Sequence, residues 1–278
     1  MNPFFQTTRL KAGYRTAVLT FSALLAAQTL GNVAPQMKSF TESIPDSVVK
    51  FDMVAIPGGK VQIDGKMVEV KPLYVAKHEA VWELFDEFLA SGEPSPPYDQ
   101  TEFSADAIAR PSKTYILPDL GWGHNGYPVI NVAYTNVMMF CRWLSSVTGK
   151  KYRLPTEAEW EWACRGGKSG EWKVDAAQME AQAWFAGNSG KMTHPVGKKA
   201  PNAFGLHDMF GNAGEWATDM NGEPVLCGGT FLDPIEKMLP GIRQRWSPKW
   251  QESDPQLPKS RWWLSDGKFV GFRLVCEG

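Results

Sequence analysis

Four residues near position 210 have the side chains and spacing needed to hold a cation. Asp208, Gly211, Ala213 and Glu215 fall within one tight turn that contains glycine. Two carboxylates and backbone carbonyls together supply the oxygen-only, flexible shell that Ca²⁺ prefers, at roughly 2.3–2.6 Å. The pattern predicts a structural calcium site. A turn whose acids accept backbone N–H groups would explain the same residues.

The histidines and cysteines show no comparable pattern. The four histidines have no i, i+3 or i+4 spacing, so none is predicted to bind a metal; they are His78, His124, His194 and His207. The four cysteines are widely separated in the sequence, at Cys141, Cys164, Cys227 and Cys276. The simplest interpretation is that all of them are buried, reduced and inert.

The first half of the chain gives clear signals for the elements that must position these residues. Residues 51–56 predict a strand, and residues 60–63 and 66–70 predict a hairpin around Asp64-Gly65, because both positions of such a turn need positive φ. Apolar residues at i, i+3, i+4, i+7 and i+8 from Val81 predict a helix that Gly92 ends.

Two further helices are predicted before the pattern becomes irregular. One runs from near Thr135 to Gly149, and the next begins at Thr156, where Thr156 and Glu159 form a capping box, and ends at Gly166-Gly167. Residues 93–128 form a long loop rich in Pro, Gly and Ser, and the chain after Trp172 shows short strands and turns. With no repeat and no break in composition, the sequence indicates one loop-rich α+β domain.

Several motifs together resemble the sulfatase-modifying-factor, or formylglycine-generating-enzyme, family. The most specific are Tyr-Arg-Leu-Pro-Thr-Glu-Ala-Glu-Trp-Glu-Trp-Ala-Cys-Arg-Gly-Gly at 152–167, Phe-Gly-Leu-His-Asp-Met-Phe-Gly-Asn-Ala-Gly-Glu-Trp at 204–216, and Gly-Phe-Arg at 271–273. Their order and spacing match the family from about residue 51 to residue 276. The resemblance implies an atypical C-type-lectin-like fold with little regular secondary structure.

The resemblance also implies particular bonds. It points to the same four positions as a family calcium site, with the carbonyl oxygens of Gly211 and Ala213 as ligands, while the family's other calcium site is not recognisable at 182–188. Cys141 and Cys276 lie at or near the positions of a family disulfide. In an oxidising compartment that bridge would contribute at most about 4–5 kcal/mol on a chain-entropy estimate.

Copper is the cofactor that this chain is not expected to hold. Family enzymes oxidise a sulfatase cysteine with copper bound by two thiolates that follow a Gly-Gly-Ser stretch, and soft thiolates do select Cu(I). Here residues 230–245 contain no cysteine, Thr230 replaces the family serine, and Gly214 replaces a family tryptophan. We therefore expect no copper centre and, with it, no oxidation of sulfatase cysteines.

A ligand groove is expected in the C-terminal part instead. By the resemblance, six residues would lie near the family's substrate groove: Thr230, Arg243, Arg245, Trp262, Trp263 and Asp266. Stacked tryptophans with arginine and an acid suit a peptide or sugar ligand. Tryptophan pairs also fill loop-rich cores, so a structural role is the alternative.

The composition and the N-terminus limit the partners. A net charge of −1 argues against nucleic acid, whose phosphates need clustered Lys and Arg. Residues 1–15 are basic and 17–27 are apolar, which predicts a signal peptide within 1–34 and export to the periplasm or the exterior. An uncleaved membrane anchor and a buried helix are the alternatives. Residues 35–50 are predicted to be a linker, and 51–278 the folded domain.

Three functions fit these observations. The first is a binding module, a family pseudoenzyme that holds an exported protein, a peptide or a glycan. The second is a family enzyme without the cysteine pair that modifies an exported protein or peptide. The third is a sulfatase-activating oxidase with relocated thiols. The local chemistry favours the binding module, because no acid–base or nucleophile constellation is recognisable in the sequence.

Overall fold

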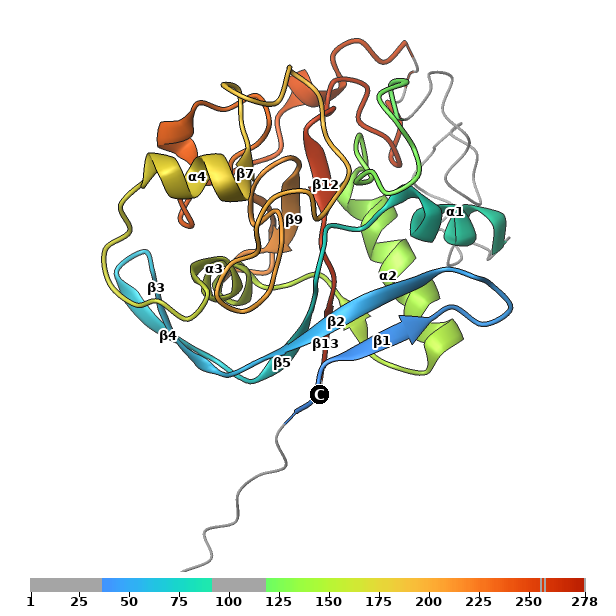
Figure 1. Ribbon diagram of the computed structural model, residues 1–278. Coiled ribbons are helices and arrows are strands. Elements are labelled where there is room, and N and C mark those ends of the chain that lie inside the picture. The colour runs from blue at the N-terminus through green and yellow to red at the C-terminus, as the bar shows by residue number, and fades with distance from the viewer. Residues whose placement is uncertain (1–36, 92–118, 256, 258, 278) are drawn as a thin grey trace, which may run out of the picture. The chain divides into compact units, whose positions relative to one another are not determined.

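The computed structural model describes residues 37–91, 119–255, 257 and 259–277, and Figure 1 shows their arrangement. A five-stranded sheet has the order β1-β2-β5-β13-β6, with every neighbouring pair antiparallel. Its strands are β1 (Phe40–Ser43), β2 (Lys50–Ile56), β5 (Leu73–Ala76), β13 (Val275–Cys276) and β6 (Tyr152–Arg153). The first and last parts of the domain therefore pair in one sheet.

Strand β1 corrects the predicted boundary of the domain. The sequence predicts a linker at 35–50, but Phe40–Ser43 pairs with β2 along its whole length. Glu42 is buried there because the Tyr152 hydroxyl, 2.5 Å away, and the Lys150 ammonium, 2.7 Å away, both donate to it. A polar strand is thus held by partners about a hundred residues along the chain, so Phe40–Ser43 belongs to the sheet and not to a linker.

A second sheet of four strands carries the C-terminal half. Its order is β11-β10-β9-β12, with strands β9 (Gly214–Thr218), β10 (Pro224–Cys227), β11 (Arg243–Gln244) and β12 (Val270–Phe272). Strands β9 and β12 are parallel, so Glu215 lies opposite Gly271. Two short pairs complete the sheets: β3 (Gly59–Ile63) with β4 (Lys66–Val70), and β7 (Ala183–Trp184) with β8 (Phe210–Gly211).

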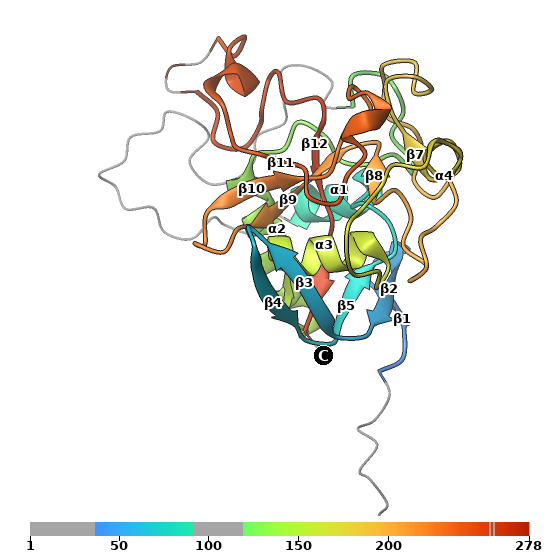
Figure 2. The same cartoon turned by 90° about the vertical axis from the view of Figure 1, so that its left-hand side faces the viewer.

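The helices lie where their apolar faces can be covered. They are α1 (Trp82–Ser91), α2 (Tyr134–Thr148), α3 (Glu157–Arg165) and α4 (Ala176–Gln182), with short 3-10 turns η1 (Ile235–Lys237) and η2 (Pro248–Gln251). In both views α2 and α3 lie on the same side of the five-stranded sheet (Figures 1 and 2). The three predicted helices are confirmed as α1, α2 and α3, and the predicted hairpin as β3 and β4.

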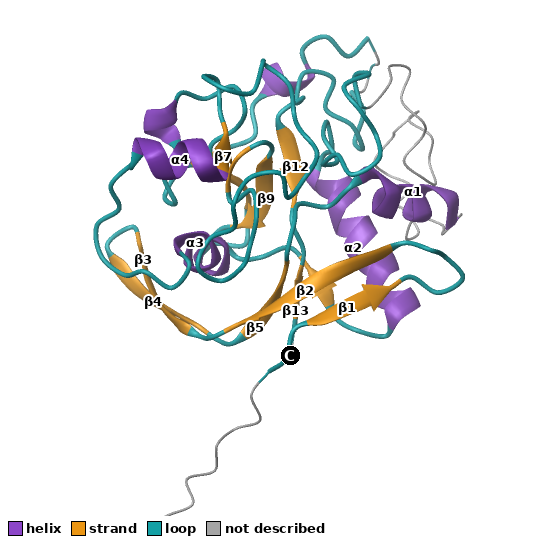
Figure 3. Cartoon of the chain, viewed as in Figure 1, coloured by secondary structure: helices purple, strands orange, loops and turns teal. Residues whose placement is uncertain are grey.

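Two apolar clusters form the core. One gathers around α1 and α2 and includes Trp82, Phe85 and Phe140, and the other surrounds α3 and includes Trp160 and Trp162. Loops make up much of the remaining chain (Figure 3). The α+β class and the loop-rich character expected from the sequence are therefore confirmed.

Within the described part of the chain, we find no helix with the length and apolar character needed to cross a bilayer.

Candidate functional site

A buried ion pair lies beside the predicted calcium turn. The carboxylate of Glu215 on β9 accepts from Arg273, with Nη2 at 2.8 Å and Nε at 3.1 Å from Oε1, and from Trp160 Nε1 at 2.6 Å. Arg273 is fully buried and also donates to two backbone carbonyls, those of Ala76 and His207. Burial alone would disfavour these charges, and each group of the pair supplies the counter-charge that offsets the burial of the other.

Two more acids lie against this pair. Glu79 accepts from Asn212 Nδ2 at 2.6 Å and from the Ala213 N–H at 2.8 Å, and burial next to Asp208 and Glu215 raises its pKa well above the usual range. Asp208 accepts from the Gly197 N–H at 2.7 Å through Oδ2, whereas its Oδ1 is buried with no hydrogen-bond partner. Burial also raises the pKa of Asp208.

The four predicted calcium ligands match this geometry only in part. Asp208 Oδ1 is an unpartnered carboxylate oxygen, as a cation ligand should be. Both oxygens of Glu215, however, already accept hydrogen bonds from Arg273 and Trp160. Binding of Ca²⁺ by Glu215 would leave the buried guanidinium short of its counter-charge. The calcium site therefore stays a prediction.

The four thiols lie inside the protein. Cys141, Cys164, Cys227 and Cys276 are all buried and all free. Burial raises the pKa of Cys141 and of Cys227 to about 12, so both stay protonated at neutral pH. Thiolate, rather than thiol, is the form that binds metals and reacts. None of the four is therefore placed as a surface nucleophile or ligand.

The structure holds Cys141 and Cys276 as separate thiols, each buried at 2% exposure. Cys276 Sγ donates to the Glu277 carbonyl oxygen at 3.4 Å. The disulfide between Cys141 and Cys276 stays a prediction that a thiol count can test.

The region that follows Gly229 is held by hydrogen bonds from N–H, hydroxyl and ammonium groups to one carboxylate. Thr230 is buried, and its N–H and hydroxyl both donate to Asp233 Oδ2, at 3.0 and 2.8 Å. Lys237 Nζ donates to the other oxygen of Asp233 at 3.0 Å. These contacts fix the turn that leads into η1, and they are made without sulfur.

Arg243 belongs to a network with α3. Its guanidinium pairs with Glu157 at 3.1 Å and with Glu161 at 2.8 Å, and Glu161 also pairs with Arg165 at 2.7 Å. The side chain of Arg243 is 18% exposed. This predicted groove residue therefore ties β11 to the helix and presents little charge to a ligand.

The other predicted groove residues have separate neighbours. Arg245 pairs with Asp219 at 2.6 Å, and Asp266 accepts from the Ser253 hydroxyl at 2.7 Å. Trp262 and Trp263 are buried at 2% and 7% exposure within the core around α1 and α2. The structure therefore places two of the six in the core and gives the rest separate polar contacts, and the groove stays a prediction.

A pocket that the sequence did not indicate is lined by Trp246 and by residues of η2. Trp246 lies two residues after the end of β11 and is 49% exposed. The pocket has a volume of about 350 Å³ and is lined by Trp246, Pro248, Lys249, Gln251, Glu252 and Lys259. The sequence could not single out Trp246, because a tryptophan in a loop-rich chain serves a core or a cleft equally well.

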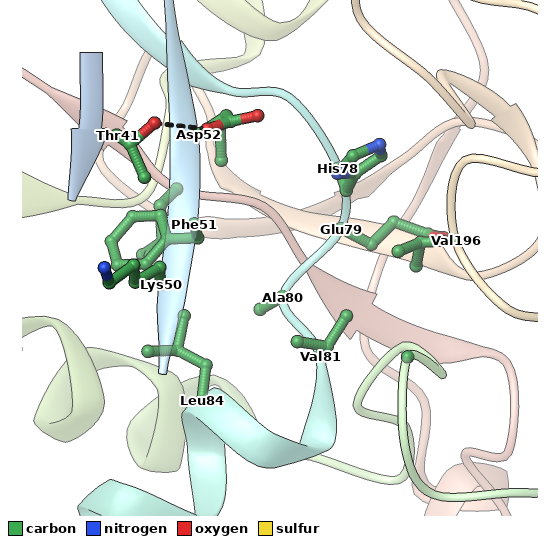
Figure 4. A pocket seen from close by; sticks show the side chains of 13 residues that line it. Thr41, Lys50, Phe51, Asp52, His78, Glu79, Ala80, Val81, Leu84 and Val196 are labelled. Carbon is green, nitrogen blue, oxygen red and sulfur yellow. Dashed lines mark hydrogen bonds between the residues drawn. The ribbon is translucent and has the colours of Figure 1, made fainter. Parts of the chain in front are cut away.

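Figure 4 shows a second hollow, between β2 and the chain that follows β5. Lys50, Phe51 and Asp52 form one wall, His78 and Glu79 lie on the other, and the volume is about 330 Å³. Burial, Arg273 and His207 together lower the pKa of His78 to about 4. Its imidazole is therefore neutral at pH 7.

Comparison with known proteins identifies the relatives. The model of the sulfatase-modifying factor enzyme 1-like domain matches residues 40–277. The formylglycine-generating enzyme of Mycobacterium tuberculosis is 39% identical over 106 residues, which are 34% of this chain and 33% of that protein. A Bos taurus protein named inactive C-alpha-formylglycine-generating enzyme 2 is 33% identical over 134 residues, 40% of each chain. These matches span well under half of either relative.

Among solved structures, the Treponema denticola variable protein 1 is similar over 86% of this chain and 99% of its own, with a TM-score of 0.60 and 22% identity. At that level of identity the likeness concerns the fold. It agrees with the arrangement of two sheets and loop-rich connections described above.

Proposed function

Because the chain belongs to the family of sulfatase-modifying factor enzyme 1-like domains, we propose that it is a binding module of this family that does not carry out copper–thiol oxidation. Its ligand would be an exported protein, a peptide or a glycan. The N-terminal segment 1–34, on which export rests, lies outside the described residues, so export is proposed from its sequence pattern.

The placement of the thiols is the observation that carries this proposal. The copper used in the family reaction is bound by two thiolates, which must be accessible to the substrate. Here all four thiols are buried, and Cys227, the cysteine that precedes the Gly228-Gly229 turn, is fully buried with its pKa raised to about 12. Residues 230–245 offer Asp233 and Lys237 in mutual contact instead. A relative that is itself named inactive supports the same interpretation.

A paired assay tests the proposal. The full chain is titrated with Cu(I) against a chelator and is then incubated under air with a peptide that carries the cysteine motif of sulfatases, and the peptide mass is measured by mass spectrometry. An authentic formylglycine-generating enzyme serves as the positive control. We expect no stoichiometric Cu(I) uptake and an unchanged peptide mass. Formation of the aldehyde would overturn the proposal.

One observation favours a second candidate, an enzyme of this family that works without the cysteine pair. A side chain whose pKa is strongly perturbed and which lines a cleft is a candidate acid–base group, and His78 meets both conditions (Figure 4). Peptide mixtures incubated with the protein and with its His78→Asn variant decide this candidate. A mass change that the variant fails to produce would support it, and identical spectra would remove it.

A further inference from the structure

Trp246 differs from the other tryptophans of the chain in its exposure. All twelve tryptophans lie in the described residues, and Trp246 is the one that is exposed, at 49%. An exposed indole leaves apolar area in water that most tryptophans bury. A flat ring at the wall of a pocket is therefore available to stack on a ligand.

The pocket beside Trp246 is held in shape by polar contacts beneath it. Gln251 is buried, and its Nε2 donates to the carbonyls of Ser260, at 2.5 Å, and Trp263, at 2.8 Å. Lys259 Nζ donates to the carbonyls of Glu252, at 3.1 Å, and Asp254. These bonds tie η2 to the chain at 259–263, so the pocket exists before any ligand arrives, which lowers the entropic cost of binding.

Two charged side chains of opposite sign line the pocket without a partner. Within the described residues, neither Lys249 nor Glu252 makes a side-chain hydrogen bond or ion pair. The pocket therefore offers a free donor, a free acceptor and an aromatic face. A simple anion would be opposed by Glu252, and a simple cation by Lys249 and Lys259.

A sugar ring matches all three features. Its hydroxyls both donate and accept, and its C–H face is apolar enough to lie on an indole. We infer that this pocket binds a short saccharide of one or two rings, with Trp246 stacked on the ring, Lys249 donating to a hydroxyl and Glu252 accepting from one. A volume of about 350 Å³ lies at the small end of ligand pockets, roughly 300–1,000 Å³, which suits a short saccharide better than an extended peptide. The inference rests on the proposed function and names its ligand.

Fluorine NMR on the full chain labelled with 5-fluorotryptophan tests the inference. The Trp246 signal is assigned from the Trp246→Phe variant, and glucose, galactose, N-acetylglucosamine and glucuronic acid are titrated separately. We expect the Trp246 signal to move with at least one sugar while the buried tryptophans stay fixed. No movement with any of the four sugars would overturn the inference.

Variants of the two charged residues distinguish specific contacts from non-specific binding. Lys249→Ala and Glu252→Ala should each weaken binding about tenfold, the effect of losing one hydrogen bond to a charged group. Lys66→Ala, an exposed lysine on the β3–β4 hairpin, should leave the affinity unchanged. Equal affinities in all three variants would contradict the assigned contacts. The aldehyde assay tests the proposed function separately. If no sugar binds and no aldehyde forms, the saccharide inference is wrong while the proposed function stands.

Discussion

Replacing Arg273 by leucine should destabilise the protein more than any surface change. The guanidinium is fully buried and makes three hydrogen bonds to Glu215 and one to each of two carbonyls, those of Ala76 and His207. Leucine removes every one of these donors at once. Glu215 is then left buried as an uncompensated charge beside Glu79, whose own pKa is already raised by burial and by its acidic neighbours.

The expected loss follows from general measurements of buried pairs. Removing one partner of a buried ion pair costs about 3–5 kcal/mol, and domains are stable by only about 5–15 kcal/mol. The double variant Arg273→Leu/Glu215→Gln removes both charges and keeps an acceptor for Trp160 Nε1. It should therefore recover a large part of the loss.

Urea unfolding followed by tryptophan fluorescence measures these differences as changes in the free energy of unfolding. Arg142→Leu is the matched control, because Arg142 is exposed on α2 and should change stability by no more than about 0.5 kcal/mol. A cost below about 1 kcal/mol for Arg273→Leu, or a double variant less stable than the single one, would show that Glu215 does not depend on this counter-charge.

Three further predictions concern the same region. Gly211→Ala would place a Cβ 2.0 Å from the Trp184 carbonyl oxygen at a φ of +73°, and should lower the free energy of unfolding, measured by thermal unfolding, by about 3 kcal/mol. Gly205→Ala is the control, with a φ of +84° and open space around the added Cβ, and should lower it by about 1 kcal/mol. Equal losses in the two variants would contradict the clash. If Ca²⁺ binds at Asp208, a hundredfold excess over its Kd raises the free energy of unfolding by about 2.7 kcal/mol, an effect that Asp208→Asn abolishes; no effect of Ca²⁺ on the wild type removes the site. Folding lowers the pKa of His78 from 6.5 to about 4. The unfolded chain therefore binds the proton first, and the free energy of unfolding decreases by less than about 3 kcal/mol as the pH drops from 6.5 to 4, because the ring is partly exposed. His78→Gln should flatten that slope, and an unchanged slope would disprove the assignment.

Elements with local signals could be predicted from the sequence. The capping box of α3 forms as expected, with the Glu159 N–H donating to Thr156 Oγ1 at 3.2 Å and Glu159 accepting from the Thr156 N–H at 2.8 Å. Asp64 and Gly65 take the positive φ that the hairpin needs. These features depend on neighbours only a few residues away, which a sequence displays directly.

Long-range pairing is what the sequence conceals. Strand β1 resembles a linker because its acid, Glu42, is buried only through Tyr152 and Lys150. Arg243 resembles a free ligand-binding charge because its partners, Glu157 and Glu161, lie on α3, more than eighty positions away in the chain. Whether a charge is free depends on which distant charge the fold brings to it.

The tryptophans illustrate the same limit for the candidate site. Trp262 and Trp263, predicted at the groove, are packed in the core, so they have the structural role that was the alternative. Trp246, which the sequence does not single out, is exposed. The family motifs showed the fold because they are long and specific. Ligand contacts are set by exposure, and exposure is a property of the packed molecule.

Thiol reactivity decides whether this chain can present a copper–thiol centre. The native full-length protein, under non-denaturing conditions, is treated with a chromogenic disulfide reagent, and the released chromophore is followed in time before and after unfolding in guanidinium. We predict no rapid reaction in the native state and four reactive thiols after unfolding, or two if Cys141 and Cys276 are bridged. Two thiols that react at once in the folded protein would contradict the proposed loss of copper chemistry, because an accessible pair is what a copper oxidase needs.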